Sequence, residues 1–441
     1  MSKFARSLCA AVLVLSGSMA QAASEKFTVD GVDVILKSQP GTPVVSVNFA
    51  LRGGLPYYGV EQAGIELLMA HAAQKGTQNY PKEKLQDLLA RTSTDIAVDA
   101  QTDYTVMSMS CLRRDLNETW KAFCDMITHP AFEEAEVTLL RDQQLGDVKQ
   151  SRDDPDTYLR TLADELHYAS HPYAVQPMGT EESVAKLDAA AVRTYHAKAV
   201  TKARGLVVLV GDIDRATAEQ LVKSGLSGLP AGSYSAPVLE PPAGAETADT
   251  RLEERDLPTN YLRGYYVAPS LDHPDYIALQ VATRILRDRL FEEVRTKRNL
   301  TYAVSAGLAS RRDNYGMLYV TAVEPDTTLR VMLNEVHRMQ SEEISEKELG
   351  DHLKVMVTQY LMDRETNATQ AAELCKYELV GSGYQVADRV VDLMRKVSRA
   401  DIQRVCQTYM KGLDFVLLGD PAKWKDPLTE DAPPKSDGSL N

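Results

Sequence analysis

Long apolar runs, paired cysteines and an excess of basic residues are all missing from this sequence. No segment after residue 22 is apolar over the roughly 20 residues that a membrane helix needs. The 441 residues include five cysteines and no Cys-x-x-Cys pattern, which argues against a cysteine-based metal or redox centre. Acidic residues outnumber basic ones by 62 to 49, giving a formal net charge of -13. This balance argues against nucleic acid and anionic membrane surfaces as partners.

The first 22 residues have the pattern of an export signal. Lys3 and Arg6 precede a short apolar stretch from Leu8 to Leu15, and Ala20 to Ala22 reads Ala-Gln-Ala, a small-x-small cleavage pattern. We therefore expect a signal peptide at residues 1–22 and a secreted mature chain. That chain would be periplasmic if the host is a Gram-negative bacterium.

Four cysteines follow the expected cleavage site, two in each half of the chain. An oxidising compartment permits the pairs Cys111–Cys124 and Cys375–Cys406. Four free, buried thiols are equally compatible with the sequence, because spacing does not determine connectivity.

A strand-and-turn pattern occurs twice, at a separation typical of whole domains. Leu206 to Asp212 is an apolar run that ends in Val-Gly-Asp, and Phe415 to Asp420 is a similar run that ends in Leu-Gly-Asp. A helical stretch with a tyrosine, Tyr195 or Tyr409, precedes each run. The repetition indicates two tandem copies of one domain.

A stretch rich in proline, glycine, alanine and serine separates the two copies. We expect an N-terminal domain at 23–225, a linker at 226–250, a C-terminal domain at 251–425 and a loose tail at 426–441.

Strand and helix patterns mix within each half. Strands are expected at 27–37 and 44–52, joined as a hairpin by a Pro-Gly turn, and at 261–267 and 317–323; helices are expected at 63–73, 81–92, 112–127, 133–151, 275–295 and 327–340. The pattern predicts an α+β fold with two tandem homologous domains, each a mainly antiparallel sheet packed by helices.

The motif that would define a zinc hydrolase is absent. Such an enzyme needs three protein ligands, an open position for water and a carboxylate base. A His-x-x-Glu-His helix supplies two of the ligands and the base. The sequence has no such motif, yet residues 64–77 read Gly-Ile-Glu-Leu-Leu-Met-Ala-His-Ala-Ala-Gln-Lys-Gly-Thr.

This stretch resembles the Gly-x-x-His-x-x-Glu-His…Gly-Thr helix of the pitrilysin/insulinase-type zinc peptidase family. Further segments resemble the same family in the same order: 147–156, His171-Pro172-Tyr173 followed by 178–183, the Val-Gly-Asp strand end, and Arg289 to Tyr302. The resemblance covers nearly the whole mature chain. It implies half of a clamshell that closes around a chamber when two such chains dimerise.

Position by position, the resemblance implies a degenerate zinc site. Leu67 replaces the first histidine, Ala70 replaces the catalytic glutamate, and His71 matches the second histidine. The third ligand falls near Asp147, to within a residue or so. Leucine offers no lone pair and alanine cannot accept a proton, so we expect no metal in this chain and no hydrolysis by it alone.

Two histidine patterns could still bind metal. His71 could be a weak relic ligand, but a lone helix histidine with a structural hydrogen bond is the simpler interpretation. His167 and His171 have i, i+4 spacing, with Glu165 nearby. Pro172 should end the helix at His171, which argues against a metal pair.

Arg295 and Tyr302 match a pair of the family's second domain that projects into the chamber, binds substrate and stabilises the oxyanion. A guanidinium and a phenol can both donate to negative charge on a carbonyl oxygen. The alternative is a solvated basic helix end with an ordinary strand tyrosine.

We therefore expect a non-catalytic subunit of a heterodimeric zinc metallopeptidase. Zinc and the base would come from a partner with an intact His-x-x-Glu-His motif, and this chain would supply Arg295 and Tyr302. Peptides or unfolded proteins would bind as an added edge strand. A non-enzymatic peptide-binding or scaffold protein is the alternative. An autonomous peptidase using His71 and Asp147 would need a new base and a further ligand.

Overall fold

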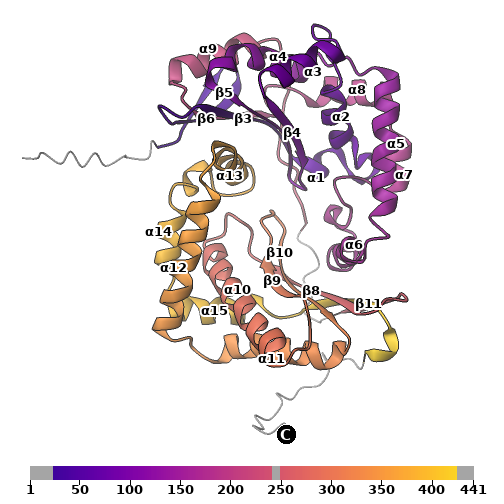
Figure 1. Cartoon of the computed structure of the whole chain (residues 1–441), viewed down its shortest axis with the longest axis vertical. Coiled ribbons are helices and arrows are strands. Elements are labelled where there is room, and N and C mark those ends of the chain that lie inside the picture. Colours follow the sequence, from indigo (N-terminus) through magenta and orange to yellow (C-terminus); the bar gives the residue numbers. More distant parts are fainter. Residues whose placement is uncertain (1–22, 241–248, 425–441) are drawn as a thin grey trace, which may run out of the picture.

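The computed structural model describes residues 23–240 and 249–424 (Figure 1). The expected signal peptide, part of the expected linker and the expected tail lie outside these residues.

The first domain contains six strands and nine α-helices: β1 (Glu25–Val29), β2 (Val32–Ser38), β3 (Val44–Arg52), α1 (Gly54–Tyr58), α2 (Ile65–Ala73), α3 (Lys82–Arg91), β4 (Asp95–Ala100), β5 (Tyr104–Leu112), α4 (Leu116–Thr128), α5 (Glu134–Gln150), α6 (Pro155–Tyr168), α7 (Glu181–Ala185), α8 (Ala189–Ala199), β6 (Gly205–Gly211) and α9 (Arg215–Leu226), counted within the described ranges. The described part of the second domain comprises β7 (Thr250–Glu254), β8 (Asn260–Ala268), α10 (Tyr276–Leu290), a π-helix (Phe291–Lys297), β9 (Val304–Leu308), β10 (Asn314–Ala322), α11 (Pro325–Ser341), α12 (Glu346–Asp363), α13 (Asn367–Leu379), α14 (Val390–Arg395), α15 (Arg399–Tyr409) and β11 (Asp414–Gly419).

The two sheets share one topology. The first has the order β1-β2-β6-β3-β5-β4 and the second the order β7-β11-β8-β10-β9. In each sheet the strand that closes the domain, β6 or β11, pairs in parallel with one neighbour and antiparallel with the other. All other pairs are antiparallel. The predicted α+β fold and its tandem duplication are therefore confirmed.

The predicted hairpin between 27–37 and 44–52 is wrong. Residues 27–37 themselves fold back on each other, because β1 and β2 pair around a turn at Asp30 and Gly31, both with positive φ. The apolar strand β6 then inserts between β2 and β3, so these two strands do not pair. The Asp-Gly sequence favours a tight turn, and this turn divides residues 27–37 into two strands.

The two domains exchange one helix each (Figure 1). Helix α6 packs on β8 and β11 of the second sheet, while α13 packs on β3 and β6 of the first. The contacts are apolar: Leu159 and Leu162 of α6 join Val416 and Leu418 of β11 in one cluster. Each sheet face is thus covered by a helix from the other half of the chain.

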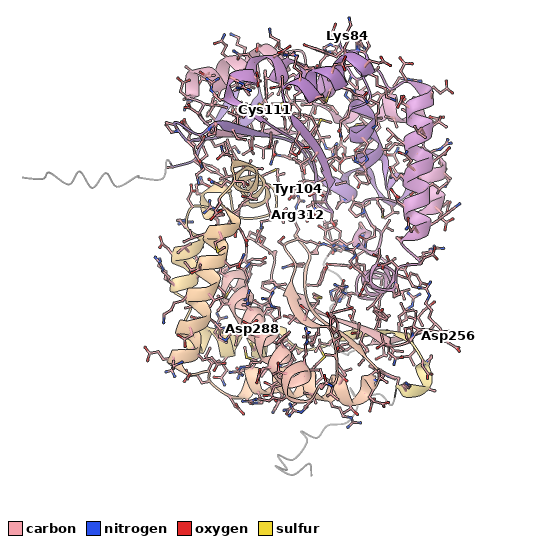
Figure 2. All side chains as sticks on the ribbon, viewed as in Figure 1. Lys84, Tyr104, Cys111, Asp256, Asp288 and Arg312 are labelled. Carbon is pink, nitrogen blue, oxygen red and sulfur yellow. The ribbon has the colours of Figure 1, made fainter. Side chains whose placement is uncertain are left out.

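The tips of two hairpins also meet at the centre of the molecule. Arg312, between β9 and β10, donates its backbone N–H to Asp103, between β4 and β5, over 3.3 Å. Figure 2 shows Arg312 and Tyr104, the residue after Asp103, close together between the domains. Together with the exchanged helices, this contact joins the two domains into one body.

All four cysteines in the described ranges are free and buried. The sequence is compatible with either two disulfides or four free thiols, and the structure has the free thiols. No helix in the described ranges is long and apolar enough to cross a membrane.

Candidate functional site

The N-terminus of α2 is fixed by a glycine and a glutamine. Gly64 precedes the helix with φ of 98°, and a Cβ there would lie 2.6 Å from the Gln144 side chain on α5. Gln144 donates to the carbonyl oxygens of Gly64 at 3.1 Å and Met178 at 2.7 Å. The glycine therefore permits the close approach of α5 to α2 on which the geometry of the degenerate zinc motif depends.

Helix α2 places the altered positions of the motif near α5. Leu67 and His71 are half-buried, and Asp147 on α5 is exposed. Burial and the nearby Lys75 lower the pKa of His71, while Asp147 acts in the opposite direction. Asp147 is therefore close enough to act on the His71 ring electrostatically.

Ala70 faces mainly apolar side chains. A cavity of about 30 Å³ lies beside it; the lining residues are Phe49, Leu51, Met69, Ala70, Thr105, Met107, Met126, Ile127, His196 and Val200. Ala70 itself is only 5% exposed. No proton acceptor stands at this position, so a water bound near His71 would have no base there.

These residues do not fit a zinc ion. Of the four positions that correspond to ligands and base, only His71 and Asp147 carry a donor atom that zinc accepts. Across residues 23–240 and 249–424, no three His, Cys, Asp or Glu side chains are grouped so that they could hold a metal. The chain has the scaffold of a zinc helix without its ligand set.

One buried ion pair beside the motif was not predicted from the sequence. Glu66, next to Leu67, is fully buried and accepts from Arg204 Nη2 at 2.5 Å and Tyr195 Oη at 2.7 Å. The Arg204 guanidinium also lies 3.7 Å from the centre of the Tyr57 ring. The signal was present: a glutamate in the apolar stretch of a helix needs a cation, and Arg204 directly precedes a buried strand.

His167 and His171, the candidate metal pair, contact two different aspartates. Helix α6 ends at Tyr168, so the rings do not share one helix face. His167 Nδ1 lies 3.0 Å from Asp414 Oδ2, and His171 Nε2 lies 3.1 Å from Asp313 Oδ2. Glu165 instead pairs with Arg251 at 2.7 Å. These side chains join the two domains and do not converge on a metal.

Arg295 and Tyr302 are together on the surface of the second domain. The Arg295 guanidinium carbon lies 4.7 Å from the centre of the Tyr302 ring and 5.0 Å from that of Phe291. Tyr302 is 81% exposed and Phe291 is 46% exposed. The arginine thus contacts two aromatic rings, both of which are exposed to solvent.

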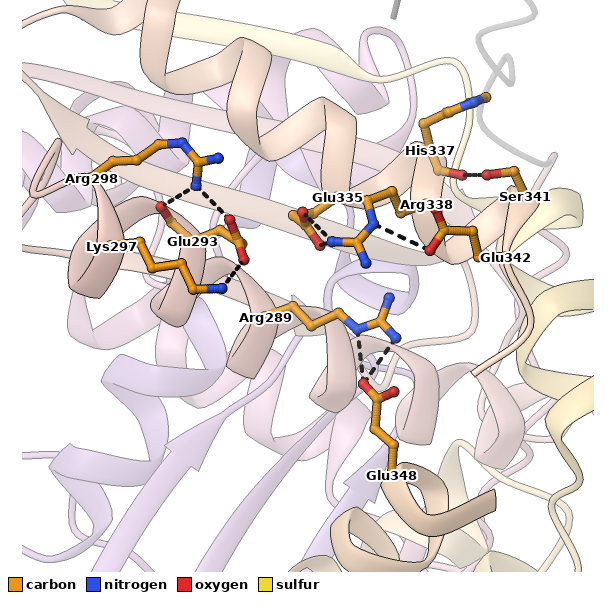
Figure 3. A network of polar contacts seen from close by, with 10 residues as sticks. All are labelled: Arg289, Glu293, Lys297, Arg298, Glu335, His337, Arg338, Ser341, Glu342 and Glu348. Carbon is orange, nitrogen blue, oxygen red and sulfur yellow. Dashed lines mark hydrogen bonds and ion pairs between the residues drawn. The ribbon is translucent and has the colours of Figure 1, made fainter. Parts of the chain in front are cut away.

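The basic neighbours of Arg295 are neutralised, but Arg295 is not. Lys297 and Arg298 both bind the Glu293 carboxylate, at 2.6 and 2.5 Å (Figure 3). No acidic side chain in the described part of the chain pairs with Arg295. Its donors are therefore free to meet an external acceptor.

The degenerate motif and the arginine–tyrosine pair lie in different domains of the chain. His71 and Asp147 belong to the first domain, and Arg295 and Tyr302 to the second. The two sets of residues are therefore carried by separate domains of one chain.

Comparisons with known proteins agree with this architecture. Residues 33–181 match the family profile "Insulinase (Peptidase family M16)", and residues 186–356 match "Peptidase M16 inactive domain". The chain belongs to the M16 family.

Three relatives span almost the whole chain. An "uncharacterized zinc protease YmxG" of Bacillus subtilis is 21% identical over 84% of this chain and 91% of its own length. The "non-peptidase homolog YmxG" of Helicobacter pylori is 22% identical over 89% and 93%. The crystal structure of "a protease from Helicobacter pylori" superposes with a TM-score of 0.84 and 18% identity, over 91% of this chain and all of that one. At this identity the structural match shows the fold alone.

Proposed function

We propose that this chain is the non-catalytic subunit of a heterodimeric zinc metallopeptidase. The observation that carries the proposal is the exposed Arg295–Tyr302 pair, in a chain whose own zinc motif lacks a ligand and the base. In the proposed complex, another chain supplies the metal helix that this chain lacks. The partner would have an intact His-x-x-Glu-His motif.

The role of this chain in the reaction follows from its free donors. The Arg295 guanidinium and the Tyr302 hydroxyl would donate hydrogen bonds to the scissile carbonyl oxygen as negative charge develops on it. The aromatic contacts hold the guanidinium in place before substrate binds, so little ordering is required during the reaction. Zinc, bound by the partner, would supply the activated water.

The substrates would be peptides or unfolded protein segments. Strand β4 forms one edge of the six-stranded sheet, and Asp95, Ala97 and Asp99 are exposed along it. An extended peptide can pair with such an edge through backbone hydrogen bonds. If residues 1–22 are a signal peptide, the two chains would meet in the periplasm or outside the cell.

The test is the activity of the complex assembled from its native partner. The chain is isolated from its host under mild conditions, and co-purifying proteins are identified by mass spectrometry. We expect a near-stoichiometric chain of similar size with an intact zinc motif. Tyr302→Phe should lower the turnover of peptide about 100-fold, the typical cost of one oxyanion donor. Tyr384→Phe, at a half-buried tyrosine next to α13, is the control for loss of a tyrosine hydroxyl elsewhere in the second domain. Unchanged turnover with Tyr302→Phe would contradict the assignment.

A peptide-binding protein without hydrolysis is the second candidate, and the open β4 edge favours it. This function predicts peptide binding by the purified chain alone or with itself, and no cleavage that depends on Arg295. Isolation of the chain without a zinc-bearing partner would support it.

A further inference from the structure

The helix that carries Arg295 changes its winding just before the arginine. Helix α10 ends at Leu290 and continues as a π-helix from Phe291 to Lys297. π-Helical turns are rare and occur often at functional sites. Within this turn Val294 is fully buried, while Phe291 remains on the surface. The inner side of the turn is therefore anchored in the core and its outer side carries Phe291 and Arg295.

Phe291 and Tyr302 both contact the Arg295 guanidinium through their rings. The ring centres lie 5.0 and 4.7 Å from its central carbon, although Tyr302 comes from the segment after the π-helix. Without Phe291, the arginine would keep one aromatic neighbour and gain freedom to rotate its long side chain. Phe291 is a large apolar side chain that is 46% exposed, and packing in the core does not account for it.

Glu293 completes the arrangement. It accepts hydrogen bonds from Lys297 and Arg298, and Arg298 also donates to the Glu293 backbone carbonyl at 2.9 Å. Although burial acts in the opposite direction, these bonds lower the pKa of Glu293. The Glu293 carboxylate therefore stays ionised and bound to Lys297 and Arg298. It does not compete with substrate for Arg295.

We infer that Phe291 is a positioning residue, which acts on the reaction by holding the Arg295 guanidinium toward the substrate carbonyl. This inference rests on the proposed function of Arg295. It assigns a role to a residue that touches neither substrate nor metal.

The experiment uses the assembled two-chain complex and a peptide substrate. Phe291→Leu keeps an apolar side chain but removes the aromatic face, so kcat should fall about two- to fivefold, the rate equivalent of one exposed cation–π contact, with KM little changed. Phe291→Trp should restore kcat, because it restores an aromatic face. Met362→Ala on α12, at a side chain that is 57% exposed, is the matched control for loss of an exposed apolar side chain.

A double-mutant cycle separates positioning from a structural effect. If Phe291 acts through Arg295, Phe291→Leu should have no further effect on kcat in an Arg295→Ala background. An equal loss in both backgrounds, or a loss that Phe291→Trp does not restore, would overturn the inference. If Arg295→Ala itself leaves kcat unchanged, the proposed function fails; if Arg295→Ala lowers kcat and Phe291→Leu does not, only this inference fails.

Discussion

Arg204 and Glu66 form an ion pair inside the first domain, with 2.5 Å between Nη2 and Oε1 and almost no exposure of either side chain. Tyr195 donates to the same carboxylate oxygen, and Arg204 Nε donates to the Arg52 carbonyl at 2.6 Å. The pair attaches the first turn of α2 to the start of the strand β6.

Breaking this pair should be costly. Arg204→Met would leave the Glu66 carboxylate buried and uncompensated, which typically lowers the free energy of unfolding by about 3–5 kcal/mol. Urea unfolding followed by circular dichroism measures the loss. The double variant Glu66→Leu, Arg204→Met should recover much of it, because no buried charge remains. If the double variant is as unstable as the single one, packing rather than charge explains the effect.

The scaffold of the zinc helix should still accept a metal when its ligands are restored. Leu67→His and Ala70→Glu together rebuild His-x-x-Glu-His, and Asp147→Glu supplies the longer carboxylate on α5. We expect the triple variant to bind about one zinc per chain, measured by elemental analysis after dialysis, because α2 and α5 keep their approach through Gly64 and Gln144.

The matched control for this design keeps the triple variant and adds His71→Ala. Zinc should be lost from that protein. Equal zinc content with and without His71 would mean that the metal binds elsewhere on the chain.

Two half-buried histidines, His71 and His196, should make the chain less stable in acid. Burial lowers the pKa of His71 and of His196 from an ordinary value of 6.5. The unfolded chain then binds protons at a higher pH than the folded chain does. The free energy of unfolding should therefore fall as the pH drops below about 6.5.

The measurement is urea unfolding at about pH 7.5 and 5.5. His71→Gln and His196→Gln should each reduce the difference between the two pH values. His337→Gln, at an exposed position on α11, is the control. A pH dependence that survives both substitutions would assign the effect to other groups.

Much of the fold follows from local sequence patterns, and the parts that do not are long-range. The repeated strand ends at 206–212 and 415–420 correspond to β6 and β11, because an apolar run bounded by Gly-Asp is a local feature. The position of β6 between β2 and β3 depends on a pairing over more than 150 residues, so the sequence suggested a hairpin there instead. Which sheet α6 covers is likewise not encoded in its own periodicity.

The same distinction between local and long-range features applies to the candidate site. The loss of a zinc ligand at Leu67 and of the base at Ala70 is evident from residue types alone, and so is the spacing of Arg295 and Tyr302. The contact of Arg295 with Phe291 is not, because it depends on the π-helical turn. The partner of Glu66 lies 138 positions away, beyond the reach of any local pattern.

Neither half of the chain should fold stably alone. Residues 23–240 would expose the sheet face that α13 covers, and would carry α6 without the sheet on which it packs. We expect each half, when it is expressed separately, to aggregate or to lack a cooperative unfolding transition. The reason is that an apolar sheet face must be buried against another element. Co-expression of 23–240 with 249–424 should yield a 1:1 complex by size-exclusion chromatography. A monomeric, cooperatively unfolding first half would contradict this expectation.

The exchanged helices also have a mechanical consequence. Rotating the two domains apart would have to pull α6 from one sheet and α13 from the other at the same time, together with ion pairs such as Lys37–Asp388 at 3.3 Å. The exchanged helices therefore oppose rotation of the two domains relative to one another. In a two-chain peptidase, this chain would move as one rigid body. Access to the chamber would then be controlled at the boundary between the chains.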